Sequence, residues 1–183
     1  MNTMSYIAYP VPLAEWLFSN TQSSWIWLII RLYLGYVWFM AGWAKVGADA
    51  WVGSKAGVAL TGFVTGALQK TSGAHPDVQG WYAAFLQNVV LPYPTFWSYI
   101  VAYGELLVGV ALILGVVTGL AAFFGAFMNL NYLMAGTVSV NPQMFLLGVF
   151  LILAWKVAGY WGGDYYVLPL LSIPRSPGGA VQQ

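Results

Sequence analysis

The stretch WIWLIIRLYLGYVWFMAGWAK, from Trp25 to Lys45, decides the fold class of this chain. Between Trp25 and Ala44 only Arg31 is charged, and a helix of about 20 residues spans roughly 30 Å, the thickness of a bilayer's hydrocarbon core. The spacing i, i+4, i+7, i+11, i+14 places five residues on one helix face: Arg31, Gly35, Trp38, Gly42 and Lys45. We expect this face to meet protein, because lipid would leave the guanidinium without a partner.

The composition agrees with a membrane protein. Of the 183 residues, 60% are hydrophobic and only 6% are charged, whereas soluble domains carry about 25% charged residues. We therefore expect an all-α integral membrane protein that forms a single domain, residues 1–183. The net charge is +1, without a basic cluster, so no nucleic-acid partner is indicated.

The residues available for redox chemistry are few. The chain has no cysteine and one histidine, His75, which excludes disulfides, iron–sulfur ligation, bis-histidine haem and a conventional zinc site built from this chain alone. His75 precedes Pro76 in a polar stretch and is interpreted as a solvated loop residue. We expect no covalent or metal-ligated cofactor, so a redox centre belongs to a partner or arrives as a substrate.

Four apolar segments predict a bundle of transmembrane helices at about 24–44, 96–114, 118–138 and 142–161. The apolar run 96–138 is about twice as long as one span, so it must fold as a hairpin, with Gly115 and Thr118-Gly119 at the turn. Asn141-Pro142 is a helix-start signal. Near the N-terminus, residues 12–18 are compatible with a short interfacial helix or with a loose tail.

The segment 46–95 is a helical insert after the first span. It carries charged residues and therefore lies outside the hydrocarbon, on the membrane surface or capping the bundle. One amphipathic pattern contains Ala56, Ala59, Leu60, Phe63, Val64 and Ala67, with Thr61 and Thr65 opposite. A second contains Val78, Tyr82, Phe85 and Val89, and Pro76 suits its start. Lys45, Lys55 and Lys70 on the insert side, against Arg175 in the tail, favour a cytoplasmic insert.

Polar residues of four different spans are predicted to share one layer. Counted at 1.5 Å per residue from the face that bears both termini, Lys156 lies roughly 8 Å deep, Arg31 about 10 Å, Glu105 about 13 Å and Asn129 roughly 16 Å. We expect Arg31 and Glu105 to pair, because each is costly alone in lipid. Two interpretations stay open: an ion pair that fixes helix register, or a polar ligand site in the membrane.

Neighbouring residues extend this hypothetical site. Trp38 shares the Arg31 face and is placed to stack on a planar ring. Lys156 is expected to extend its ammonium group to the lipid headgroups. Asn129 and Asn131 cannot share a helix face, so one joins the polar layer while the other meets an adjacent helix or another subunit.

Several motifs resemble the DoxX/DoxD-like family. They are Arg31-x3-Gly35-x6-Gly42-x2-Lys45, then Gly104-Glu105-Leu106-Leu107-Val108-Gly109 running into Leu114-Gly115-x2-Thr118. Two further segments are similar to the DoxD branch: Gly80-Trp81-Tyr82 to Leu91-Pro92, and Asn129-Leu130-Asn131-Tyr132 through Ala135-Gly136-Thr137 to Asn141-Pro142.

This resemblance implies a four-helix membrane fold and, through the DoxD branch, a link to thiosulfate:quinone oxidoreductase, which passes thiosulfate electrons to membrane quinone. The family's arginine and glutamate map onto Arg31 and Glu105. We expect a multi-pass protein of a bacterial or archaeal cytoplasmic membrane, in contact with lipid and with other subunits of a membrane complex.

Two main hypotheses about function follow. In the first, the chain is the membrane subunit of a quinone-linked oxidoreductase, with Glu105 and Arg31 as catalytic candidates and quinone held by Arg31, Trp38, Glu105 and Asn129. In the second, it is a non-catalytic accessory subunit of a respiratory or photosynthetic complex, and the Arg31–Glu105 pair is structural. A small transporter is less favoured, because the spans show neither repeats nor broken helices.

Overall fold

The computed structural model describes residues 11–171, and every regular element in that range is helical. The helices are α1 (Pro12–Ser19), α2 (Ser24–Val46), α3 (Val58–Leu68), α4 (Gly80–Phe85), α5 (Pro94–Leu114), α6 (Thr118–Met134), α7 (Asn141–Leu153), α8 (Trp155–Ala158) and α9 (Asp164–Leu170). Two 3₁₀ turns, η1 (Thr21–Ser23) and η2 (Gln69–Thr71), and a π-helical segment, η3 (Leu86–Val90), complete the elements. The all-α prediction is confirmed over the described part of the chain. Arg175, used in the orientation prediction, lies outside the described residues.

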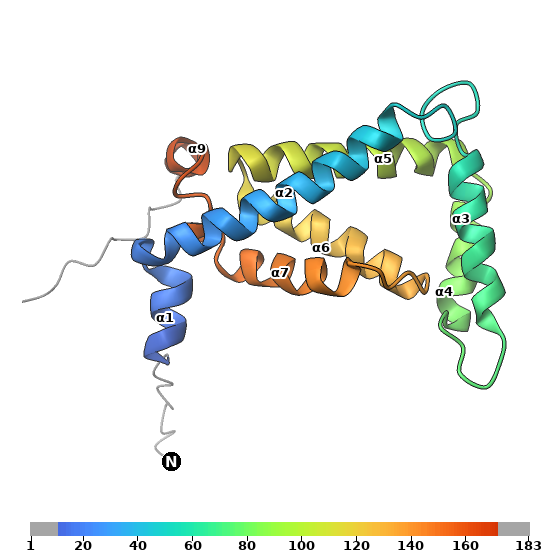
Figure 1. The fold of residues 1–183 in the computed structure, drawn as a ribbon, viewed down its shortest axis with the longest axis horizontal. Coiled ribbons are helices and arrows are strands. Elements are labelled where there is room, and N and C mark those ends of the chain that lie inside the picture. Colours follow the sequence, from blue (N-terminus) through green and yellow to red (C-terminus); the bar gives the residue numbers. More distant parts are fainter. Residues whose placement is uncertain (1–10, 172–183) are drawn as a thin grey trace, which may run out of the picture.

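Four helices form the body of the molecule (Figure 1). α2 packs chiefly on α5, and α6 packs chiefly on α7, while contacts between α5 and α6 join the two pairs. The hairpin between α5 and α6 turns where the glycine and threonine signals predict. Gly115 has φ +65°, the left-handed conformation that ends a helix at low cost, and α6 starts at Thr118.

Two of these helices, Thr21–Val46 and Pro94–Leu114, are long and apolar enough to cross a bilayer. The other two are shorter than predicted, since α6 has 17 residues and α7 has 13, which correspond to about 25 and 20 Å. Gly136, at φ +69°, follows the end of α6 and stops it four residues before the predicted limit of 138. Four spans therefore remain a prediction.

The insert forms two helices that lie across one end of the body, while α1 lies at the other end (Figure 1). α3 buries Leu60, Val64 and Ala67, members of the predicted face. The second pattern was wrong in two respects: α4 begins at Gly80, well after Pro76, and Val89 is 42% exposed. Its C-terminal part winds as a π-helix in which Leu91 N–H donates to the Leu86 carbonyl, 2.9 Å away. The wider turn buries Val90 instead.

Residues 12–18, for which the sequence allows a short helix or a loose tail, are helical in the structure. Residues 12–19 form α1, and its end is fixed against the start of α2. The ring of Phe18 stacks on Trp27 at 5.4 Å between centroids, and Trp27 Nε1 donates to the Leu17 carbonyl at 2.7 Å. α1 thus covers the end of the bundle opposite the insert.

The described residues form two hydrophobic cores. The larger lies inside the bundle and includes Leu34, Trp38, Leu112, Leu151 and Val157. The smaller lies under the insert and includes Leu60, Val64, Val78, Tyr82, Leu86 and Ala135. The outer faces of α5 and α6 nevertheless expose large apolar side chains, among them Leu107, Phe123 and Phe127. A continuous apolar exterior of this kind suits contact with lipid.

Candidate functional site

Arg31 does not pair with Glu105, so that prediction was wrong. Its Nη1 donates to the carbonyls of Leu112 and Ile113, at 2.5 and 3.0 Å, and Nη2 donates to the carbonyl of Trp161 at 3.1 Å. The first two carbonyls belong to the last turn of α5, where unpaired acceptors and the negative end of the helix dipole favour a cation. Arg31 therefore serves as a C-terminal cap for α5.

The register of α2 against α5 explains the error. A methyl group at Gly42 would collide with the backbone of Leu106, and one at Gly109 with the backbone of Phe39. These contacts place Glu105 opposite the end of α2 that is far from Arg31. The predicted depths of Arg31 and Glu105 are measured from the end of each residue's own span. In the structure, however, α2 extends beyond the C-terminal end of α5 on the side where Arg31 lies. Gly42, which faces Glu105 and Leu106, lies eleven residues after Arg31, so Arg31 and Glu105 are about three helical turns apart, roughly 16 Å along the axis.

Asp164 completes the structural role of the Arg31 region. Its carboxylate oxygens accept hydrogen bonds from the backbone N–H groups of Val117 and Thr118, at 2.5 and 2.9 Å, and the residue is 2% exposed. A carboxylate at the N-terminus of α6 satisfies orphan donors and complements the positive end of the dipole. Arg31 at the C-terminus of α5 and Asp164 at the N-terminus of α6 thus stabilise the two sides of the turn that joins these helices.

Glu105 has two other partners. Lys45 Nζ lies 2.6 Å from Glu105 Oε2, and the Tyr132 hydroxyl donates to Glu105 Oε1 at 2.5 Å. The Glu105 side chain is 1% exposed, while that of Lys45 is 21% exposed. The sequence places Lys45 on the same helix face as Arg31. Because Lys45 lies near the end of the predicted span, it is predicted to lie at the membrane–water interface and not in the site. No sequence signal marks Tyr132.

A cavity of about 340 Å³ opens beside this trio and is lined by Lys45, Glu105 and Tyr132. Trp38, 3% exposed, forms part of the wall, with its ring 6.5 Å from that of Tyr132. Trp51 also lines the cavity, and Lys45 Nζ lies 5.2 Å from the centroid of its indole ring. The remaining wall is largely apolar, apart from Thr137, Ser139 and Asn141 near the link between α6 and α7. Planar aromatic walls and a few convergent polar groups are typical of small-molecule sites.

The other predicted residues lie elsewhere. Asn129 is 1% exposed, is not among the residues that line this cavity, and has no hydrogen-bond partner for its side-chain amide within residues 11–171. Asn131 meets α4, where its Oδ1 accepts from the Tyr82 hydroxyl at 3.1 Å. Lys156 is exposed, with Nζ 5.5 Å from the Trp155 ring, as expected for a lysine that extends to the headgroups.

The described residues contain no group of three or more His, Cys, Asp or Glu side chains that would suit a metal ion. His75 is exposed. The side chains of Lys45, Glu105 and Tyr132 can supply hydrogen bonding, charge stabilisation and proton transfer.

Comparison with known proteins gives one family. Residues 26–158 match the family model of DoxX. This range contains all but the first two residues of α2, the helices α3 to α8 and every residue of the Lys45–Glu105–Tyr132 site. No curated protein and no solved structure matches the chain.

Proposed function

The chain belongs to the DoxX family, and from this premise we propose that it is the membrane subunit of a quinone-linked oxidoreductase. The observation that supports the proposal most directly is the Lys45–Glu105–Tyr132 trio, centred on the buried Glu105, beside Trp38 in a cavity of about 340 Å³. A quinone ring is planar, uncharged and carries two hydrogen-bond acceptors. Trp38 offers a stacking surface, and the Lys45 ammonium group, which gives one of its three N–H groups to Glu105, offers donors to the ring oxygens.

The trio is suited to quinone reduction, in which a quinone takes up two electrons and two protons to become a quinol. The Lys45 ammonium group stabilises the negative charge that develops on the nearer quinone oxygen. Lys45 passes one proton to the nearer quinone oxygen. Tyr132, whose single O–H proton is donated to Glu105 at 2.5 Å, supplies the second after its hydroxyl turns toward the quinone, and Glu105 also binds Lys45 Nζ at 2.6 Å. Ser139, on the exposed link between α6 and α7, lines the cavity where replacement protons enter.

The electrons come from a partner subunit in this proposal, because the chain has no cysteine and one histidine. In the thiosulfate form of the reaction, two thiosulfate ions each lose one electron and join through a new S–S bond as tetrathionate. The two electrons and two protons then convert one quinone to quinol. Arg31 has no place in this scheme, since its Nη atoms are engaged by three backbone carbonyls.

The test is turnover in the native complex. Glu105→Gln keeps the side-chain size but cannot exchange a proton, and we expect kcat to fall about 100-fold. Lys45→Met should reduce kcat by a similar factor, whereas Lys55→Met, which removes an exposed lysine of the insert, should leave it unchanged. Full turnover in an assembled Glu105→Gln complex would leave the accessory-subunit alternative as the better description.

A further inference from the structure

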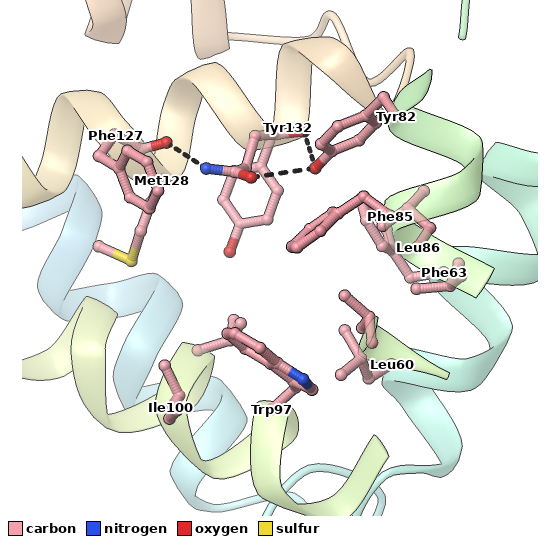
Figure 2. A pocket seen from close by; sticks show the side chains of 14 residues that line it. Leu60, Phe63, Tyr82, Phe85, Leu86, Trp97, Ile100, Phe127, Met128 and Tyr132 are labelled. Carbon is pink, nitrogen blue, oxygen red and sulfur yellow. Dashed lines mark hydrogen bonds between the residues drawn. The ribbon is translucent and has the colours of Figure 1, made fainter. Parts of the chain in front are cut away.

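A second cavity, of about 190 Å³, lies between the insert and the body of the bundle (Figure 2). Its walls come from α3, α4, η3, α5 and α6 and are almost entirely apolar. In Figure 2 the side chains of Trp97 and Ile100 face those of Leu60, Leu86 and Tyr132 across the open space. An engineered apolar cavity of about 150 Å³ holds a benzene molecule, so this one accepts an apolar group of at least that size.

The polar atoms at the edge of this cavity are already engaged. The Tyr82 hydroxyl donates toward the backbone and side-chain oxygens of Asn131, at 3.0 and 3.1 Å. Burial raises the pKa of Tyr82 to about 12, so the hydroxyl stays a neutral donor at physiological pH. Asn131 Nδ2 donates to the Phe127 carbonyl at 2.8 Å. The cavity therefore presents hydrocarbon to an occupant.

The two cavities share walls. Leu60, Phe63, Val101 and Tyr132 line both. Phe63 meets the Tyr132 ring edge-on, with centroids 5.9 Å apart. Tyr132 thus presents its hydroxyl to Glu105 on the polar side and its ring to the apolar side. A ligand that fills both spaces must have a polar head joined directly to an apolar chain.

The apolar cavity also borders the outer surface of the bundle. Two of its lining residues, Ile100 and Phe127, are 45% and 54% exposed on the faces of α5 and α6. A chain longer than the cavity can leave past these side chains into the surrounding lipid. A neutral head group fits the polar end better than an anionic phospholipid head does, because Glu105 already neutralises Lys45.

We propose that the two cavities form one site for an amphipathic quinone, with the ring beside Lys45–Glu105–Tyr132 and the first segment of its apolar tail between Trp97, Leu86 and Ile100. This inference rests on the proposed function and deepens it, because it assigns the tail of the quinone a place inside the protein, in the cavity between the insert and the bundle. Phe63 and Tyr132 hold the junction between ring and tail.

The experiment compares two quinones on the full chain in phosphatidylcholine nanodiscs, by equilibrium binding of the radiolabelled compounds with empty nanodiscs subtracted. One is a tail-free dimethoxymethyl benzoquinone, and the other carries the same ring with a decyl tail. Ile100→Trp fills the apolar cavity. Leu107→Trp adds the same ring two turns along α5, where the native side chain is 67% exposed and lines neither cavity.

We expect Ile100→Trp to weaken binding of the decyl quinone about tenfold and to change that of the tail-free quinone less than about twofold. Leu107→Trp should change neither. Unaltered decyl-quinone binding in Ile100→Trp, or an equal loss for both quinones, would overturn the tail site and leave the ring site standing. If the wild-type chain binds neither quinone, the proposed function fails together with the tail site.

A measurement on the wild-type chain avoids any folding defect of the variant. A quinone that carries a photoreactive diazirine on the first carbons of its tail is cross-linked in the same nanodiscs, and labelled peptides are identified by mass spectrometry. We expect labels on residues 97–101 and 127–132. Labels confined to lipid-facing positions such as Leu107 and Phe123 would place the tail outside the protein and overturn the proposal.

Discussion

Breaking the Lys45–Glu105 pair should have asymmetric consequences. The Glu105 side chain is 1% exposed and the Lys45 side chain is 21% exposed. Lys45→Met strands a buried carboxylate, for which the cost is about 3–5 kcal/mol. Glu105→Gln strands a lysine that can turn toward the surface, so its cost should be smaller, about 1.5–3 kcal/mol, the value of one lost hydrogen bond to a charged group.

The double variant Lys45→Met/Glu105→Gln tests the pairing itself. Neither charge is orphaned in it, so its loss of stability should be smaller than the sum of the two single losses by about 2 kcal/mol. SDS unfolding followed by far-ultraviolet circular dichroism measures the free energy of unfolding of the wild type, of each single variant and of the double variant. Lys156→Met, an exposed lysine on α8, is the matched control and should stay within about 0.5 kcal/mol of wild type. Additive losses within about 0.5 kcal/mol would refute the coupling.

Four further outcomes are expected. Arg31→Ala and Glu105→Gln should be additive in the same SDS assay, because the residues are roughly 16 Å apart along the axis and share no partner. A coupling energy above about 1 kcal/mol would contradict the observed register. Asp164→Asn should lower stability by about 1–2 kcal/mol by weakening the cap on Val117 and Thr118, and an unchanged midpoint would show that the cap is dispensable. Gly42→Ala should lower the free energy of unfolding by about 2 kcal/mol or more, because the added methyl group collides with Leu106. Gly62→Ala, which has open space around it on α3, should raise the free energy of unfolding by up to about 1 kcal/mol. A cysteine at Ser72, exposed beyond α3, should react with impermeant maleimide only from the cytoplasmic side if the lysine bias sets the orientation; labelling of intact cells from outside would reverse it.

The positions of the helices could be predicted where the sequence marks helix ends chemically. Gly115 and Thr118 mark the hairpin, and Asn141-Pro142 starts α7. Glu105 could be singled out because it is the only charge in its apolar segment. The orientation prediction is weaker than the sequence indicated, because Lys45 is directed into the site, which leaves Lys55 and Lys70 on the insert side.

The partner of Glu105 could not be predicted because it depends on how far α2 slides along α5. Each residue of slip moves a side chain by about 1.5 Å along the axis and by about 100° around it. Arg31 and Lys45 both lie on the face of α2 that meets α5, 14 residues or about 21 Å apart along the axis, so the offset between the two helices decides which of them reaches Glu105. The backbone contacts at Gly42 and Gly109 set this register, and they require the packed structure. Tyr132 was missed for a related reason, since its role arises from the approach of α6 to α5.

The contacts of Arg31 also impose an order on biogenesis. α2 leaves the ribosome before the other long helices, yet one carbonyl that its guanidinium binds belongs to Trp161, 130 residues later. Until that segment emerges, the charge must stay near water or lipid phosphate, because a bare guanidinium in hydrocarbon is unfavourable. We therefore expect α2 to reach its final depth only after α5 and the 159–163 loop have been made. The first long helix to be made would then be among the last to settle, and truncation of the chain before Trp161 should cause a packing defect around Arg31.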